Sequence, residues 1–568
     1  MVHRSSPSLR LGLLAALALL LAACMPMPLP TPQPPPPGAT PAPPPSPEKP
    51  TEPPADWCVP LAQGAGQAPI PADLKPGELF LPRQVILTGR RSEVAKVVEA
   101  LPDLELRPLR EPIDLSYLEK LARPDRPEQK PQAADAVAAG PLPWPDSADL
   151  AVQLYGVGAA TPVPEVVSRV YAAAAEAGVV VAADPNYVTG FPIVGSPWEI
   201  EGSPWEIEGS PGGGSPVEAQ PLFWKQWGFV EAAGIVSGGS LQPGSRTVKP
   251  TGRGVTVAVF DTAPFETGGL HLLRQIEPPL ALCVTKGATA VSYPNLRLRD
   301  VSNHGVFVAG LAFGVAPDAR YHLVEVLNST GQGDLVTLLD MLNRFMAQSA
   351  DPARPQPWGH TVVNLSLGVP DPKDAGLAPT LLPLMRRVLG AGGAGYAPPL
   401  PDRHPIVALE MLLASYVARG GTVVAAAGNR SFDVSAARPA QIPAAYPFVV
   451  GVAASNQKGQ RSCYANAGDI AAPGGDGAPA AGGSPACTPS HTACPTDRPD
   501  CPYGVISLTR DGYAYWVGSS FATPMVSGAA ALWLEAGTAP ETLFLALKTA
   551  GPRPDLGRGV LDLAGGVP

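Results

Sequence analysis

Short, largely apolar runs between residues 255 and 453 constrain the fold more than any other feature of the chain. Each run is rich in Val: residues 255–260, 323–326, 362–365, 422–426 and 448–453. Such runs are typical of parallel strands buried on both faces of a sheet, because an exposed face would place polar residues at every second position. Helical segments are expected between them, at 304–312, 335–346 and 406–419. The alternation predicts an α/β fold, a doubly wound and mostly parallel sheet, over residues 222–568.

Three residues with catalytic potential stand at the edges of these elements. Asp261 ends the first apolar run, His304 opens a helix, and Ser520 precedes another helical stretch. In open α/β sheets the active site lies beyond the carboxyl ends of the strands, and Asp261 has that position. A Ser hydroxyl becomes a good nucleophile when a His removes its proton, and an Asp can hold that His in the right tautomer. The sequence therefore predicts a catalytic triad of Asp261, His304 and Ser520.

The stretches around these residues, 255–262, 303–310 and 518–524, resemble the motifs of the subtilisin-like serine proteases (subtilases), which share the order Asp, His, Ser. The resemblance implies a serine endopeptidase that works through an acyl-enzyme and acts on proteins or peptides. It also implies that Asn429 supplies the side-chain donor of the oxyanion hole. The implied substrate-binding residues are Ser366, Leu367 and Gly368 at the specificity pocket, Gly331 and Gly333 at the edge that pairs with an extended substrate, and Ala427 and Gly428. With further matching segments at 446–447, 472–474 and 557–562, the resemblance covers residues 222–568.

Several residues depart from the family pattern without replacing a triad member. Ala263 stands where Gly is usual, and Val306 and Phe307 stand in place of Thr and His; we expect Phe307 to fill the space of that second His. These departures leave a second interpretation, a catalytically weak or inactive subtilase-like binding protein (a pseudoprotease). A third is a narrow processing enzyme whose access is restricted by an apparent insertion at 370–405. The chemistry requires no cofactor, and although calcium often stabilises members of this family, no metal ligand is assigned in this chain.

Residues 56–190 are expected to form a smaller α+β domain. Strand-like segments at 79–88, 104–109, 150–155 and 179–182 and helical segments at 92–101 and 164–177 follow the order βαββαβ of a ferredoxin-like domain. In this position the domain resembles the family's propeptide, which implies a folding chaperone and temporary inhibitor. Its ending, 183–188, resembles the point where the propeptide leads into a tail in the active-site cleft. An unrelated small α+β domain is the alternative.

The first 55 residues indicate export. Arg4 and Arg10 precede a 13-residue apolar run, and small residues then lead to Cys24, so residues 1–23 resemble a lipoprotein signal peptide with lipid on Cys24. An ordinary secretory signal is the alternative. The Pro-rich segment 24–55 favours polyproline II and would act as a spacer. We expect a cell-envelope lipoprotein, held at the membrane through Cys24, or an extracellular protein after processing.

A second linker is expected at 191–221, where a Gly-Ser-Pro-Trp-Glu-Ile-Glu unit occurs twice before a Gly-rich stretch. Its composition favours an exposed segment, and its place between two domains makes it a candidate for cleavage during maturation. The net charge of −9 and the absence of a basic patch in the sequence argue against nucleic acid as a partner. Six Cys follow Cys24, and in an exported chain an even number favours disulfides over a metal cluster, with 15 pairings open: Cys58, Cys283, Cys463, Cys487, Cys494 and Cys501.

Overall fold

The computed structural model describes residues 57–567 apart from a set of gaps. The gaps are 62–71, 75–77, 119–141, 145, 159, 191–221, 230–249, 288–290, 293–299, 350–357, 373–375, 392–395, 397, 401–402, 432–435, 477, 480–486, 489–503 and 565–566. The chain divides into two units, Met1–Glu52 and Pro53–Pro568, and only the second contains described residues. The predicted signal peptide, Cys24, the Pro-rich segment, the repeat linker, Cys494 and Cys501 all lie outside the described residues.

An eight-stranded sheet forms the centre of the larger domain. Its order is β16 (Ile470–Pro473), β15 (Val450–Ser455), β14 (Thr422–Ala426), β13 (Thr361–Leu365), β7 (Thr256–Asp261), β11 (Arg320–Glu325), β9 (Leu280–Thr285) and β8 (Gly269–Leu273). All neighbouring pairs are parallel except β8 with β9. The doubly wound, mostly parallel sheet expected from the Val-rich runs is confirmed.

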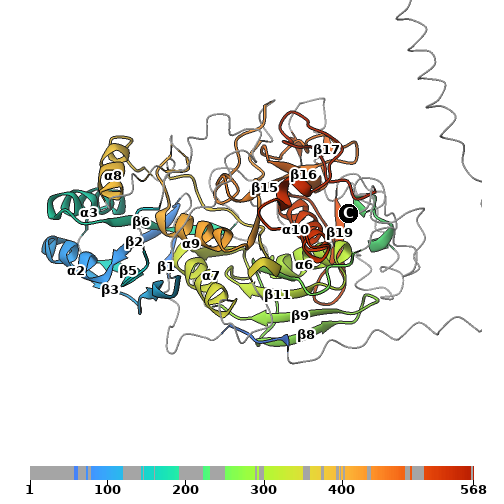
Figure 1. Cartoon of the computed structure of the whole chain (residues 1–568), viewed down its shortest axis with the longest axis horizontal. Coiled ribbons are helices and arrows are strands. Elements are labelled where there is room, and N and C mark those ends of the chain that lie inside the picture. The colour runs from blue at the N-terminus through green and yellow to red at the C-terminus, as the bar shows by residue number, and fades with distance from the viewer. Residues whose placement is uncertain are drawn as a thin grey trace, which may run out of the picture. The chain divides into compact units, whose positions relative to one another are not determined.

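Helices cover both faces of this sheet. On one face α6 (His304–Val315) packs against α10 (Ser519–Glu535), and on the other α7 (Leu335–Ser349) packs against α9 (Val407–Ala418) (Figure 1). Residues of β7 alternate between two hydrophobic cores: Val257 and Val259 belong to the core with α6 and α10, and Ala258 and Phe260 to the core with α7 and α9. Burial on both faces is the reason that four consecutive residues of the strand, 257–260, are apolar.

The smaller domain contains an antiparallel sheet. Its elements are β2 (Phe80–Arg90), α2 (Arg91–Glu99), β3 (Leu106–Pro108), β4 (Ile113–Asp114), β5 (Leu150–Val157), α3 (Val163–Ala177) and β6 (Val181–Gly190). The sheet order is β6-β2-β5-β3, with the short β4 also paired to β5. Apart from β4, the elements follow the order βαββαβ. The helix α3 ends at Gly178, which has φ +63° and so suits a residue without a side chain.

The last strand of this domain is longer than the sequence indicates. We predicted a strand at 179–182 followed by a tail, whereas β6 continues without a break to Gly190. Its second half is held as a strand by antiparallel pairing with β12 (Gln332–Asp334) of the larger domain. A partner 140 or so residues away in the chain leaves no local signal in residues 183–190.

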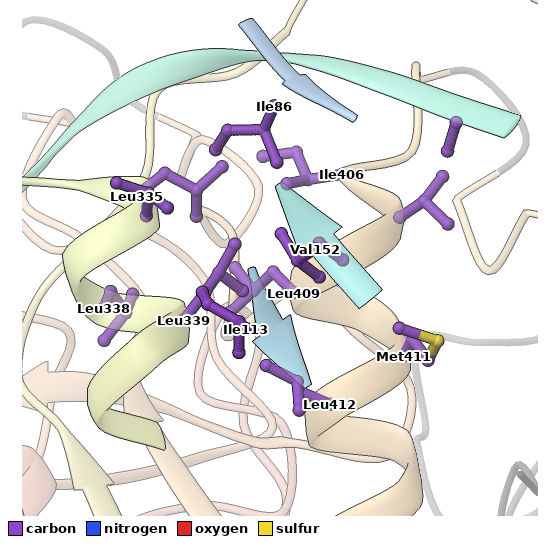
Figure 2. Close-up of a cluster of buried hydrophobic side chains, with 14 of the residues drawn as sticks. Ile86, Ile113, Val152, Leu335, Leu338, Leu339, Ile406, Leu409, Met411 and Leu412 are labelled. Carbon is purple, nitrogen blue, oxygen red and sulfur yellow. The ribbon is translucent and has the colours of Figure 1, made fainter. Parts of the chain in front are cut away.

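The two domains share one hydrophobic core. Figure 2 shows Ile86, Ile113 and Val152 of the smaller domain's sheet facing α7 and α9. The facing residues are all buried: Leu335, Leu338, Leu339, Ile406, Leu409, Met411 and Leu412. The smaller domain is therefore packed against the helices on one face of the larger sheet.

Shorter elements complete the described part of the chain. They are β1 (Ala72–Asp73) paired with β10 (Val291–Ser292), the hairpin of β19 (Val505–Leu508) and β20 (Tyr513–Trp516), β17 (Ala478–Pro479) paired with β18 (Cys487–Thr488), α8 (Leu381–Gly390), α11 (Leu543–Ala546), and three short 3₁₀ turns at Pro102–Leu104, Ser116–Leu118 and Trp358–His360. The helix α8 lies within the insertion predicted at 370–405. None of the helices in the described ranges has the length and apolar character needed to cross a membrane.

Candidate active site

Asp261 lies at the carboxyl end of β7, near the middle of the large sheet, and is fully buried. Its Oδ1 atom accepts a hydrogen bond from the backbone N–H of Thr262 at 2.7 Å. The Thr262 hydroxyl donates to the carbonyl of Ser302 at 2.8 Å and accepts from the N–H of Gly305 at 3.0 Å. Thr262 therefore joins the end of β7 to the start of α6.

His304 is the first residue of α6, and its Nδ1 lies 2.7 Å from Asp261 Oδ1. A carboxylate oxygen accepts, so Nδ1 is the donor in this hydrogen bond, and Nε2 of the neutral imidazole is the nitrogen that can take up a proton. Gly305 makes this approach sterically feasible: a Cβ at that position would lie 2.2 Å from the carbonyl oxygen of Thr262. The His-Gly pair is thus required by the close contact of helix and strand.

Aromatic rings surround His304. The imidazole centroid lies 5.1 Å from the ring of Phe521 and 5.5 Å from that of Trp516. Phe307 is buried and packs against the same two rings, at 4.6 Å from Trp516 and 4.7 Å from Phe521. Sequence reasoning missed Trp516 and Phe521, whose only signal was their position next to the Gly-Ser-Ser motif.

Ser520 is the second residue of α10, where the first N–H groups of the helix have no partner within the helix and the dipole is positive. Its hydroxyl donates to the carbonyl of Ser366 at 3.2 Å, and the Ser366 hydroxyl donates to the carbonyl of Ser520 at 2.8 Å. This reciprocal pair holds the start of α10 against the segment that follows β13. Ser520 is only 6% exposed in this arrangement.

Asn429 follows β14 and lies beside the same helix start. Its side-chain oxygen accepts from the N–H of Ser519 at 2.9 Å, which identifies the oxygen branch of the amide. The Nδ2 hydrogens are then the donors that Asn429 offers to a ligand. The preceding Gly428 has φ +108°, a conformation that favours glycine, and its N–H donates to the Ser519 hydroxyl at 3.1 Å. Ala427 is buried, with its N–H bonded to Val452 on β15.

The two segments predicted to bind substrate lie on either side of the end of β6. Gly333 pairs with Thr189, and Gln332, next to Gly331, pairs with Gly190. On the other side, Gly190 and Gly368 exchange backbone hydrogen bonds of 3.0 and 3.2 Å in an antiparallel bridge, and Leu367 beside them is buried. An extended piece of this chain thus occupies the place that the sequence predicts for an extended substrate.

The Ala263 departure causes no backbone strain. Ala263 is not among the described non-glycine residues with positive φ, and its carbonyl accepts from Lys286 Nζ at 3.0 Å. Lys286 also pairs with Glu325 at 2.5 Å; burial raises the pKa of that carboxyl, and the Lys286 contact opposes the rise. These residues line a polar cavity of about 440 Å³ beside Thr262. Across the described ranges, no group of three or more His, Cys, Asp or Glu side chains could hold a metal ion.

Comparisons with known proteins place this site in context. A family model described as "Subtilase family" matches residues 252–550, just over half of the chain. Subtilisin E of Bacillus subtilis (strain 168) is 27% identical over 296 residues, which are 50% of this chain and 56% of that protein. The minor extracellular protease Epr of the same organism is 26% identical over 236 residues, 39% of this chain and 27% of Epr.

The chain spans about half the length, or less, of these curated relatives. A solved structure described as proteases from Pseudoalteromonas arctica PAMC 21717 is 23% identical and covers 61% of this chain and 97% of that one, with a TM-score of 0.39.

Proposed function

The chain belongs to the subtilase family, and on that premise we propose that it is an exported serine endopeptidase that hydrolyses peptide bonds through an acyl-enzyme on Ser520. One observation carries the proposal. Asp261, His304, Asn429 and Ser520 come from four separate elements, yet they gather around the carboxyl ends of β7, β13 and β14 and the amino end of α10. The His304–Asp261 hydrogen bond and the burial of both side chains support their use as base and orienting carboxylate.

The chemistry follows from these contacts. His304 Nε2 takes the proton of the Ser520 hydroxyl as Oγ attacks the substrate carbonyl carbon, and Asp261 stabilises the resulting imidazolium. The carbonyl oxygen becomes an oxyanion, which the Asn429 side-chain amide and the N–H groups at the start of α10 can stabilise. His304 then gives its proton to the leaving amine, the C–N bond breaks, and water repeats the sequence to release the acyl group.

The end of β6 supports two further parts of the proposal. Its pairing with Gly333 and Gly368 supports β-augmentation as the way in which extended protein or peptide substrates bind. It also supports an inhibitory propeptide, because residues 188–190 fill the groove that a substrate strand would need. The smaller domain then serves as an intramolecular inhibitor, and as a folding template for the surface that it covers.

The proposal also includes export and membrane attachment through a lipidated Cys24. Only the sequence pattern supports these two parts. Cell-envelope or extracellular proteins are then the accessible substrates. Structural calcium likewise stays an expectation from the resemblance.

Hydrolysis of casein and of a peptide library by wild type and Ser520→Ala, after release of the smaller domain, tests the function. A triad serine typically contributes roughly 10⁶ in kcat, so Ser520→Ala should abolish turnover. Equal turnover by both proteins would refute the mechanism. Peptide binding without any turnover by the released wild type would favour the pseudoprotease, and cleavage of a few library peptides but not casein would favour the narrow processing enzyme.

A further inference from the structure

A disulfide joins the two domains across a long stretch of chain. Cys58 and Cys283 are bonded, with Cα atoms 5.1 Å apart and a separation of 225 positions in the sequence. Cys283 lies on β9 of the large sheet and is buried, whereas Cys58 precedes the whole smaller domain. The peptide connection between the domains, by contrast, runs through residues 191–221, because Phe223, Trp227 and Phe229 already belong to the core of the larger domain. The domains are therefore linked twice, once at each end of the smaller domain.

The segment around Cys58 is itself fixed to the larger domain. The N–H of Leu61 donates to the hydroxyl of Thr285 at 2.9 Å, and Gln348 on α7 donates to the carbonyl of Val59 at 3.0 Å. Leu61 is 3% exposed. A little further along, β1 pairs in parallel with β10. Residues 58–61 and 72–73 are thus anchored on the larger domain independently of the chain that enters it at residue 222.

We propose that a cut between the domains does not release the smaller domain: the processed protein is a two-chain molecule, held by Cys58–Cys283, in which residues 79–190 stay docked over the active site. The cut itself rests on the proposed function, and it would fall within the linker 191–221. Removing the inhibitor then takes either reduction of this disulfide or a second cut between Cys58 and Leu79. Residues N-terminal to Cys58 stay linked to the catalytic part in every case except reduction.

Docking is reinforced by a helix that the insertion supplies. The contacts of α8 reach α3 and β6 of the smaller domain. Its Leu381, Met385 and Val388 are buried in the core that both domains share. Arg110 of the smaller domain also pairs with Asp340 of α7 at 2.5 Å, with both side chains largely buried.

The tether also raises the effective concentration of the inhibitor. After a cut, the smaller domain would remain attached through about twenty residues (59–78), and short tethers of this kind give effective concentrations of roughly millimolar. Dilution after export would then not free the active site. The disulfide converts an inhibitor that could diffuse away into one that needs a second chemical event.

The test uses the full chain with Ser520→Ala and a recognition site for a sequence-specific protease inserted after Gly214. Because the cut is made by an added protease, the result does not depend on whether the protein is itself an enzyme. After complete cutting, a denaturing gel without reductant should show one band at the uncut mass, and reductant should give two bands. Two bands without reductant would overturn the proposal.

A matched control is the same protein with Cys58→Ser and Cys283→Ser, which should give two bands with or without reductant. Should that variant fail to fold, peptide mapping of the parent keeps the proposal falsifiable. A Cys58–Cys283 linked peptide is expected, and Cys58 linked to any other cysteine would refute the pairing. Hydrogen exchange reports docking: amides of α8 in the cut parent should exchange as in the uncut one, and at least tenfold faster exchange would show that the domain had left.

Discussion

Docking of the smaller domain should depend on pH through Asp184. This residue lies on β6, is 3% exposed, and accepts hydrogen bonds from the N–H groups of Val407 and Ala408 at the start of α9. Burial, with a smaller contribution from the nearby Glu410, raises its pKa to about 8 against the opposing effect of the helix N–H bonds. Its Oδ2 atom meets no donor among the described residues. Protonated Asp184 is therefore the form that the docked state favours.

The magnitude follows from the two states of Asp184. In an undocked domain the carboxyl would titrate near its ordinary value of 3.8, and in the docked state near 8. Docking thus takes up a proton at any pH between these values. The affinity should be greatest below pH 4, fall by up to about tenfold per pH unit up to pH 8, and level off above it. Over the whole window the loss is at most about four decades, or roughly 6 kcal/mol.

The assay compares cut proteins that lack the disulfide: Ser520→Ala with Cys58→Ser and Cys283→Ser, with or without Asp184→Asn. The dissociation constant of the two fragments would be measured by sedimentation between pH 5 and 8.5. Asp184→Asn should reduce the slope of log Kd against pH by about one. The remaining groups near Asp184, namely Glu410, Tyr171 and Tyr187, are the same in both proteins. Identical slopes for the two proteins would refute the assignment.

Further predictions concern the site and the domain contact. Asn429→Ala should lower kcat for peptide hydrolysis by roughly 10²–10³ with little change in KM, because an oxyanion donor acts in the transition state; an effect on KM alone would contradict this. Gly305→Ala should destabilise Ser520→Ala protein by about 1–3 kcal/mol in chemical unfolding, since its Cβ would meet Thr262, whereas Gly390→Ala, where nothing lies within 4 Å, should be near neutral. Asp340→Asn should weaken docking of the smaller domain by about 2 kcal/mol in the sedimentation assay. Asp318→Asn, whose Arg253 pair is exposed, should have no effect there.

Features set by local pattern were predictable from the sequence. The Val-rich runs identify the central strands because side chains on both faces of such a strand are buried. Successive residues of β7 illustrate this: Val257, Ala258, Val259 and Phe260. Asp261, His304 and Ser520 could be proposed as a triad because each stands at the edge of an element and they follow the order Asp, His, Ser of the subtilases; Asn429 was implied by that resemblance. What the structure adds is their contacts, such as the bond of Asn429 to the N–H of Ser519.

Features set by distant partners were not predictable. The strand β8 is a partly exposed edge strand with His271 at its centre, so it lacks the pattern of the buried strands. Cys58–Cys283 was one of 15 equivalent pairings. The helix α8 did carry a signal, since Leu381, Met385, Val388 and Leu389 follow i, i+4, i+7 and i+8, but Pro and Gly on both sides concealed it.

Catalysis as proposed requires that Ser520 is a nucleophile activated by His304 and Asp261. The most direct measurement is the mass of peptides from protein treated with a fluorophosphonate, after the smaller domain has been released by cutting and removal of the Cys58–Cys283 bond. One phosphonyl adduct on Ser520 is expected, absent from Ser520→Ala and strongly reduced in His304→Ala. An unmodified Ser520 in folded, released protein, or equal labelling in His304→Ala, would contradict it.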